Sequence, residues 1–230
     1  MDIDLNLDDP THRMAAAPTR AGKSYFIGAC VEQLYDQEKP FIVLDTKTEN
    51  HIGLQELPKV KKVQMKPGLK YNWDKFSDYD YLLCVPTLRT RTADLINLYR
   101  DMVDNLFMEQ GERHFFIEEA HNWNKNASVA DPLLELIARE GAGKKKFLWF
   151  ITQRLQNFPQ ILWSQCGYTF VFRHNIPTDI RYLEQGIPNF NDINRSLSKH
   201  DVLMWDHGSI DGTYKIIKAA EVKRRTTHRG

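Results

Sequence analysis

Two kinds of hydrophobic pattern alternate along the chain. Short runs of consecutive apolar residues, such as FIVL, YLLCV and FLWFI, are typical of strands that are covered on both faces of a sheet. Between these runs, apolar residues recur every three or four positions, which predicts helices with one buried face. Strands separated by helices in this order indicate an α/β fold built around a mostly parallel, doubly wound sheet.

The pattern also gives the expected bounds of the elements. It predicts core strands near residues 13–17, 41–45, 81–85, 114–118, 147–152 and 169–173, with helices near residues 23–36, 92–109, 132–140 and 159–165. After Arg173 we expect a short helix near residues 178–185, a polar loop over 188–194, and a hairpin that pairs residues 201–205 with 213–219. We expect a single domain over residues 1–230, with a core at about 12–175 and a C-terminal extension at about 176–230.

The composition excludes several classes of protein and site. Hydrophobic residues make up 42% and charged residues 27% of the sequence, as is usual for a globular protein, and no apolar run reaches the ~18 residues of a membrane span. The acidic N-terminus differs from a secretory signal. The 3 cysteines lie far apart in apolar runs and the 8 histidines are scattered, so we expect reduced core thiols in a cytosolic protein and no Cys/His metal site.

The net charge of +1 does not by itself indicate a nucleic-acid partner. Basic residues are nevertheless concentrated in three runs, at positions 59–62, 144–146 and 223–229. Each run has the local density of Lys and Arg that phosphate contacts need. Solvated edges and a frayed C-terminal end are the simpler explanation of each run taken alone.

A phosphate-binding loop is the strongest motif in the chain. It lies between the first predicted strand and a predicted helix and comprises Ala17, Pro18, Thr19, Arg20, Ala21, Gly22, Lys23 and Ser24. This spacing places backbone N–H groups and a helix N-terminus around the phosphates of ATP, with Lys23 on the β- and γ-phosphates and the Ser24 hydroxyl on Mg²⁺. Ala17 replaces the usual first glycine, which a negative φ would permit, whereas Gly22 needs the freedom of glycine.

Two adjacent acids follow the strand HFFI. A buried strand that ends in carboxylates is costly unless a cation meets them. In the second motif of phosphate-loop ATPases, the first acid, here Glu118, holds Mg²⁺, and the second, here Glu119, acts as the base for the attacking water. Taken alone, two acids at the end of a strand are also explained as ordinary polar residues of a junction.

Gln153 ends the apolar strand FLWFIT. Because ligands of doubly wound sheets meet the carboxyl ends of strands, Gln153 is expected beside Glu119 and the γ-phosphate, where it would sense the nucleotide or orient water. The loop after the second strand, from Asp45 to Glu49, lies near the same site in the expected topology. Turn chemistry explains that loop equally well.

The chain resembles the FtsK–HerA superfamily of P-loop ATPases, in particular small viral genome-packaging ATPases. The resemblance runs from about Arg13 to Arg173 and is carried by APTRAGKS, FFIEEAHNW and LLELIAREGAGKKKFLWFITQRLQNFP. It implies a three-layer P-loop NTPase fold of the RecA/FtsK type, with a mostly parallel central sheet and, here, a C-terminal β-hairpin extension. It also implies ATP and Mg²⁺ as ligands.

The resemblance further implies an arginine finger that acts on the nucleotide of a neighbouring subunit. Arg139 is the best match by position. Ala142 stands where many relatives have a second basic residue, so Arg154 and Arg173 remain candidates for the finger. A helix C-terminal charge explains Arg139 equally well.

The resemblance implies a motor that hydrolyses ATP and translocates double-stranded DNA into a viral capsid. Its partners would be DNA, further copies of itself in a ring of five or six, and capsid or membrane-associated vertex proteins. It would lie in the host cytoplasm, in the virion, or in both. The lack of a large accessory domain favours packaging over a cellular or plasmid DNA pump of the same superfamily. Functions of a different class also stay open, namely a P-loop kinase, a nucleotide switch and a nucleotide-binding structural subunit.

Overall fold

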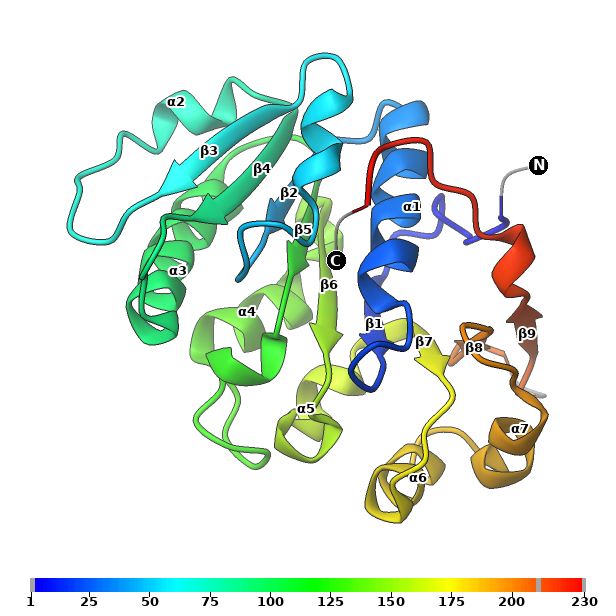
Figure 1. Cartoon of the computed structure of the whole chain (residues 1–230). Coiled ribbons are helices and arrows are strands. Elements are labelled where there is room, and N and C mark those ends of the chain that lie inside the picture. Colours follow the sequence, from blue (N-terminus) through cyan, green and yellow to red (C-terminus); the bar gives the residue numbers. More distant parts are fainter. Residues whose placement is uncertain (1–2, 210–211, 229–230) are drawn as a thin grey trace.

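A central sheet organises the chain in the computed structural model, which describes residues 3–209 and 212–228 (Figure 1). Its strands are β1 (His12–Ala16), β2 (Phe41–Leu44), β3 (Lys61–Met65), β4 (Tyr81–Pro86), β5 (Arg113–Ile117), β6 (Lys146–Thr152), β7 (Cys166–Phe172), β8 (Val202–Asp206) and β9 (Tyr214–Ile217). They form one nine-stranded sheet in the order β3-β4-β2-β5-β6-β1-β7-β8-β9 within the described residues. Strands β1 to β7 run parallel to one another, whereas β8 is antiparallel to β7 and β9 is antiparallel to β8.

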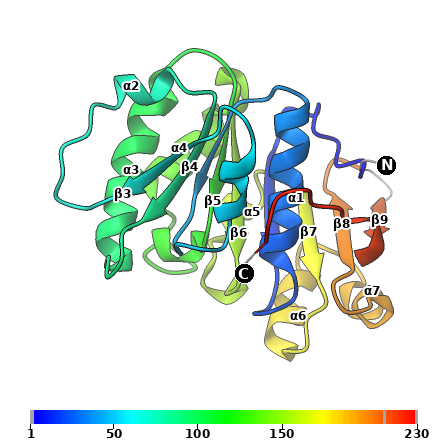
Figure 2. The same cartoon turned by 45° about the horizontal axis from the view of Figure 1, so that its top comes forward.

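Helices cover both faces of the sheet, as Figures 1 and 2 show. The α-helices are α1 (Lys23–Asp36), α2 (Asp74–Ser77), α3 (Thr92–Met108), α4 (Pro132–Glu140), α5 (Gln160–Trp163), α6 (Pro177–Glu184) and α7 (Phe190–Ser196). Short 3₁₀ turns are η1 (Ile52–Glu56), η2 (Ala120–Trp123), η3 (Ala142–Lys144), η4 (Leu155–Asn157) and η5 (Ala219–Glu221). None of the helices described is long and apolar enough to cross a membrane.

The two faces have separate hydrophobic cores. In β1, Met14 and Ala16 pack into the core beneath α3, α4 and α5, whereas Ala15 packs into the core beneath α1. Successive side chains of a strand point to opposite faces. A central strand with a core on each side must therefore be apolar at every position, which is why the inner strands appear in the sequence as unbroken apolar runs.

The structure confirms the α/β class and the predicted order of core elements. Helices α1 and α4 have the predicted bounds, and β8 pairs with β9 as the predicted hairpin. Ile210 and Asp211 in the predicted turn lie outside the described residues. The buried tryptophans Trp149 and Trp163 and the three buried free cysteines also agree with the prediction.

One prediction was wrong, and two elements were missed. Residues 188–194 were expected as a polar loop, but Phe190–Ser196 form α7. Phe190 is fully buried and Ile193, one turn later, packs against the same core, so two apolar residues suffice to hold a short helix. The missed elements are α2 and β3, and β3 is exposed along most of its length, so its sequence lacks an apolar run.

The three basic runs of the sequence differ in exposure and packing. Lys61 and Lys62 are exposed on β3, which is one edge of the sheet, and Lys215 is exposed on β9, the other edge. Lys146 is buried and donates a hydrogen bond to the carbonyl oxygen of Gly111. The C-terminal run is not a frayed end as far as His228, because residues 222–228 pack against α1; Arg229 lies outside the described residues.

Candidate functional site

The predicted phosphate loop joins a central strand to a helix N-terminus. β1 ends at Ala16 and α1 begins at Lys23. Gly22 has φ +98°, and a Cβ there would lie 2.9 Å from Nδ1 of His200, so both backbone and packing require glycine. Ala17 is fully buried and is not among the residues with positive φ, so a methyl group fits where the usual phosphate-loop motif has glycine.

The start of α1 is suited to an anion. No side chain of the described residues caps this N-terminus, so its first N–H groups are available to an anion, and Gly22, Lys23 and Ser24 line a cavity. The cavity has a volume of about 590 Å³. Its lining includes residues from the loop, from β7 and from the C-terminal part of the chain: Pro18, Thr19, Arg20, Gly22, Lys23, Ser24, Tyr25, Phe26, Lys47, Asn50, Gln153, Phe172, His200, Ala219, Val222 and His228.

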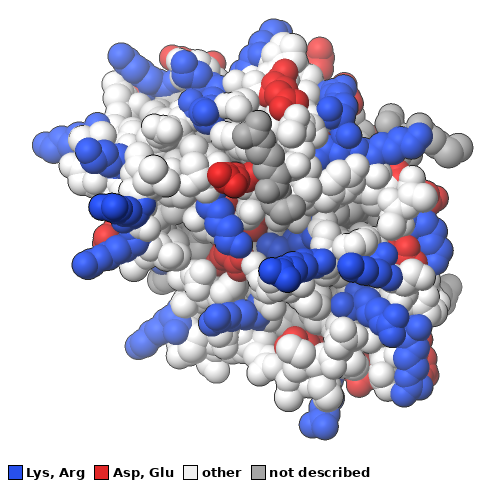
Figure 3. All heavy atoms as spheres, in the orientation of Figure 1, with Lys and Arg blue, Asp and Glu red and all other residues white. Residues whose placement is uncertain are grey.

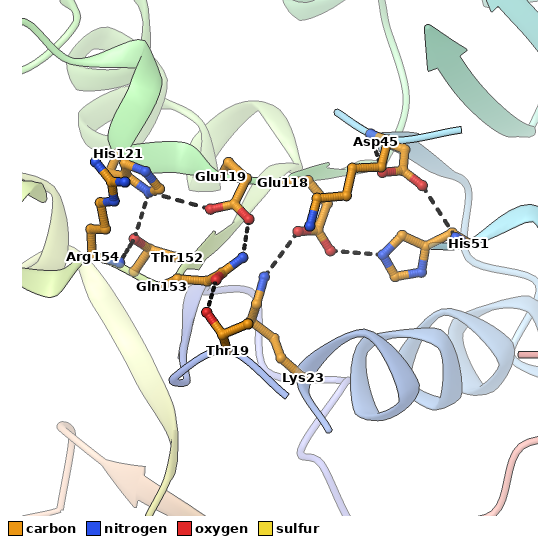
Figure 4. A network of polar contacts seen from close by, with 11 residues as sticks. Thr19, Lys23, Asp45, His51, Glu118, Glu119, His121, Thr152, Gln153 and Arg154 are labelled. Carbon is orange, nitrogen blue, oxygen red and sulfur yellow. Dashed lines mark hydrogen bonds and ion pairs between the residues drawn. The ribbon is translucent and has the colours of Figure 1, made fainter. Parts of the chain in front are cut away.

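Glu118 lies at the inner end of this site. Its carboxylate is fully buried and accepts hydrogen bonds from Nζ of Lys23 at 3.0 Å and from Nε2 of His51 at 2.7 Å (Figure 4). Burial alone would raise the pKa of this carboxyl, but Lys23 and His51 outweigh it and lower the pKa. Glu118 is therefore an anion held between two donors.

His51 was not predicted. It belongs to the loop after β2, where its backbone N–H donates to Oδ2 of Asp45 at 3.1 Å. The Asp45 side chain is also buried, and its pKa is raised by burial and by the charge of Glu118. Asp45 thus fixes the loop that brings His51 to Glu118. Nothing in the sequence marks His51, because its partner Glu118 lies 67 residues away.

A second group of contacts connects Glu119 to the phosphate loop. The amide nitrogen of Gln153 donates to Oε1 of Glu119, and the hydroxyl of Thr19 donates to Oε1 of Gln153 at 2.8 Å (Figure 4). Glu119 has φ 50°, in the left-handed region, at the junction between β5 and η2. A non-glycine residue in that region is strained, and such strain is common at functional sites.

His121 and Thr152 support this second group. Nδ1 of His121 lies 3.1 Å from the Thr152 hydroxyl and 3.5 Å from the Glu119 carboxylate. Burial, with the nearby charges of Arg154 and Lys23, lowers the pKa of His121 to about 4. His121 is therefore neutral at physiological pH. It packs the loop as expected, but it also contacts Glu119, which was not expected.

The predicted site residues come together with one exception. β2, β5, β6 and β1 are consecutive in the sheet, so their carboxyl ends bring Asp45, the acid pair, Gln153 and the phosphate loop to one edge. Arg154 and Arg173 follow β6 and β7 at this edge and are exposed. Arg139 lies before β6, at the opposite edge, and its partner is Glu135 at 4.0 Å. A seven-residue strand spans roughly 20 Å, so Arg139 does not contact the site of its own chain.

The donors present suit a magnesium nucleotide. The Ser24 hydroxyl and the Glu118 carboxylate are the hard oxygen ligands that Mg²⁺ prefers. Lys23 and the N–H groups of α1 are the donors that phosphates need. Among the described residues, no group of three or more His, Cys, Asp or Glu side chains is arranged to hold a metal by itself. The site therefore fits a cation that comes with phosphate oxygens.

A parallel sheet with a phosphate loop after a central strand, an acid pair after the next strand but one, and helices on both faces defines the fold of P-loop NTPases. No protein-family model and no curated protein matches the sequence. The comparison with solved structures agrees with the fold. The genome-packaging NTPase B204 of Sulfolobus turreted icosahedral virus 2, solved with AMPPCP, superposes with a TM-score of 0.68 at 16% identity, over 91% of this chain and 97% of that one.

Two further proteins share the fold. The bacterial conjugative coupling protein TrwBΔN70 gives a TM-score of 0.56 at 11% identity, covering 93% of this chain and 80% of that chain. EccC of Thermomonospora curvata also gives 0.56, at 14% identity, covering 90% of this chain and 37% of the larger protein. The chain thus shares the P-loop NTPase fold of these proteins, including that of a viral genome-packaging NTPase.

Proposed function

We propose that this protein is an ATPase that moves double-stranded DNA, as a subunit of a ring that fills a viral capsid. The observation that carries the proposal is the continuous set of contacts from Thr19 in the phosphate loop through Gln153 to Glu119. These contacts connect the place where a γ-phosphate would bind to the acid that would activate water. A chain built only to bind nucleotide has no need of such a connection.

Binding begins at the phosphate loop. The N–H groups of α1 and the ammonium of Lys23 hold the phosphates, for which Lys23 gives up its contact with Glu118. Ser24 and Glu118 are the residues that would hold Mg²⁺, which neutralises phosphate charge when it is bound. His51 continues to hold Glu118 after Lys23 has turned to the phosphates, because it contacts the other carboxylate oxygen.

Hydrolysis then uses Glu119 and Gln153. Glu119 accepts a proton from a water molecule, whose oxygen bonds to the γ-phosphorus while the bond to the β,γ-bridging oxygen breaks. ADP and phosphate are the products. Gln153 orients the Glu119 carboxylate and reports through Thr19 whether the phosphate loop is filled. A finger supplied by a neighbouring subunit, with Arg139 as first candidate, would stabilise the charge that develops.

The surface supports a polyanionic partner. Exposed basic side chains follow the carboxyl ends of β1, β2, β4, β6 and β7, namely Arg20, Lys47, Arg89, Arg91, Arg154 and Arg173. At the same edge of the sheet, Asp45, Glu118 and Glu119 are buried, whereas Glu49 beside Lys47 is exposed. Figure 3 shows lysine and arginine side chains spread widely over one face of the molecule. Such a rim attracts phosphates without reading sequence, so DNA affinity should fall steeply with salt.

The partners and location follow from the same proposal. B204 is described as a genome-packaging NTPase, and a chain of this fold acting in the same way would assemble into a ring of five or six copies. It would contact capsid or membrane-associated vertex proteins, in the host cytoplasm or on the virion. The nearest alternative to capsid filling is the function of a cellular or plasmid DNA pump with the same fold.

The experiment is a steady-state ATPase assay with and without long double-stranded DNA, at several protein concentrations and two salt concentrations. We expect turnover that rises with DNA and with protein concentration, and DNA stimulation that weakens in high salt. Glu119→Gln should bind ATP and lose at least ~10²-fold in turnover. Glu140→Gln, an exposed acid on α4, is the matched control and should behave like the wild type.

Different outcomes would favour the kinase, the switch or the structural subunit. ATP consumption only in the presence of an added acceptor would indicate a kinase. Turnover that is indifferent to DNA and to protein concentration would contradict the motor and favour a switch. A protein that binds ATP but is unaffected by Glu119→Gln would be a structural subunit.

A further inference from the structure

The C-terminal segment, residues 222–228, crosses the outer side of α1 (red in Figures 1 and 2). It follows η5, and its Val222 and Thr226 are buried. The Arg224 side chain is fully buried beside Glu32 of α1, with Nε 3.5 Å from Oε1. A basic segment that the sequence suggests to be solvated is therefore packed onto the helix that begins the phosphate site.

Two acids hold the backbone of this segment. The Glu32 carboxylate accepts the N–H of Arg225 at 2.8 Å and both the N–H and the hydroxyl of Thr226, at 3.1 and 2.6 Å. The Thr227 N–H donates to Glu56 of η1 at 3.0 Å. Charge-assisted hydrogen bonds of this kind are the strong ones, and here they fix consecutive backbone groups. These hydrogen bonds fix the C-terminal segment to α1 and η1.

Two glycines make room for it. A Cβ at Gly28 would overlap the guanidinium of Arg224, and a Cβ at Gly53 would overlap the backbone of Thr227. Neither glycine has a positive φ. Their role is thus the close approach of the C-terminal segment rather than an unusual backbone conformation.

The same segment forms one wall of the phosphate cavity. Val222 and His228 line it, together with Tyr25 from the first turn of α1 and Phe172 from the end of β7. The rings of Tyr25 and His228 meet edge to face, with centroids 5.5 Å apart. In the proposed site a γ-phosphate would lie at the end of the cavity marked by Thr19 and Gln153, so the nucleoside of ATP would extend toward the wall made by these aromatic and apolar residues.

We propose that the C-terminal segment completes the base-binding half of the nucleotide site, with Tyr25, Val222 and His228 as the side chains that hold the adenine. The inference rests on the proposed nucleotide function and adds the part of the chain that recognises the base. A flat base needs apolar or aromatic contact on its faces, which these three residues supply. Nδ1 of His228 lies 3.0 Å from Arg224 Nη1. Because a guanidinium only donates, Nδ1 is the acceptor and Nε2 carries the ring hydrogen.

The test separates the base from the phosphates. Dissociation constants of the full chain are measured for AMPPCP, which has a nucleoside, and for inorganic tripolyphosphate, which does not. His228→Ala removes one wall residue, and Thr226→Pro removes an N–H that Glu32 accepts. Asp36→Asn is the matched control, because it removes only the exposed ion pair of Arg225 with α1.

We expect both His228→Ala and Thr226→Pro to raise the Kd for AMPPCP about tenfold, equivalent to about 1.4 kcal/mol, and to leave tripolyphosphate binding unchanged. Asp36→Asn should change neither. Hydrogen exchange of the wild-type protein should show residues 222–228 protected by AMPPCP and not by tripolyphosphate.

The proposal is overturned if His228→Ala binds AMPPCP like the wild type, if the variants weaken both ligands equally, or if both ligands protect residues 222–228 equally. A wild-type protein that binds neither ligand would overturn the nucleotide function itself. A wild-type protein that binds both with the same affinity would overturn only the base-binding wall.

Discussion

Lys23 and Glu118 form a buried ion pair with 3.0 Å between Nζ and Oε2. The side chains are 7% and 0% exposed, so water screens this pair little. Each residue neutralises the other while no phosphate is bound. Nucleotide binding therefore has to replace one buried partner of Lys23 with another.

Lys23→Met tests this pairing. The substitution leaves the Glu118 carboxylate with His51 as its donor, and breaking one side of a buried pair costs about 3–5 kcal/mol. We expect a matching fall in the free energy of unfolding in urea, together with loss of ATP binding. The double variant Lys23→Met/Glu118→Gln should recover most of the stability but none of the binding. Equal stability of the single and double variants would contradict the pairing.

Thr19→Val tests the connection between the phosphate loop and Glu119. Valine keeps the shape of threonine but removes the hydroxyl that donates to Gln153. The Gln153 amide then keeps only its contact with Glu119 and is held less firmly. We therefore expect kcat to fall about tenfold, the effect of one lost hydrogen bond in the transition state, with KM nearly unchanged. Thr19→Ser keeps the hydroxyl and should restore turnover. A change in KM alone would mean that Thr19 only binds phosphate.

The position of Arg139 gives a prediction about assembly. It lies one strand length from the site of its own chain, so as a finger it would act on a neighbouring subunit. Arg139→Ala and Glu119→Gln should each be inactive alone, whereas an equal mixture should regain about one quarter of wild-type activity, since about one interface in four joins two intact halves.

The same mixture with Arg154→Ala or Arg173→Ala in place of Arg139→Ala identifies the finger. An Arg139→Ala variant that is fully active, or one that is inactive and not rescued by mixing, would exclude a finger at this position. Rescue seen only with Arg154→Ala or Arg173→Ala would assign the finger there.

His12 predicts a loss of stability in mild acid. Burial, helped by the charge of Arg13, lowers the pKa of His12 from 6.5 to about 4. Between these pH values the unfolded chain binds a proton at His12 that the folded chain does not. Stability is therefore lost as pH falls through this window, by up to about 1.4 kcal/mol per pH unit.

Urea unfolding at pH 7, 6 and 5 measures this slope. In His12→Asn, the amide oxygen can accept the Leu148 N–H that Nδ1 of His12 accepts at 2.9 Å. In that variant, the slope of the unfolding free energy against pH should fall by the contribution of one proton. Other buried histidines such as His121 should keep their contributions. An unchanged slope would show that His12 does not titrate in this way.

The parts of the site that could be predicted are those encoded locally. The phosphate loop is a contiguous motif, and the acid pair and Gln153 each end an apolar strand, so their common edge follows from the order of strands and helices. His51 and the C-terminal segment could not be found in this way. Glu32 and Thr226 are 194 residues apart, and their contact depends on the fold of the whole chain rather than on any local pattern. Helix α7 could not be predicted for the same reason, because the burial of Phe190 that holds it depends on the folded chain.

The edges of the sheet limit how copies of this chain can join. An unprotected edge strand offers free N–H and C=O groups to another copy, and lysines on such strands oppose that pairing. Lys61 and Lys62 stand on β3 and Lys215 on β9, so both borders carry positive charge. Two copies brought together border to border would repel one another. In the proposed ring, neighbouring copies would therefore be joined through loops and helices, which would leave each sheet free to turn as a separate rigid unit.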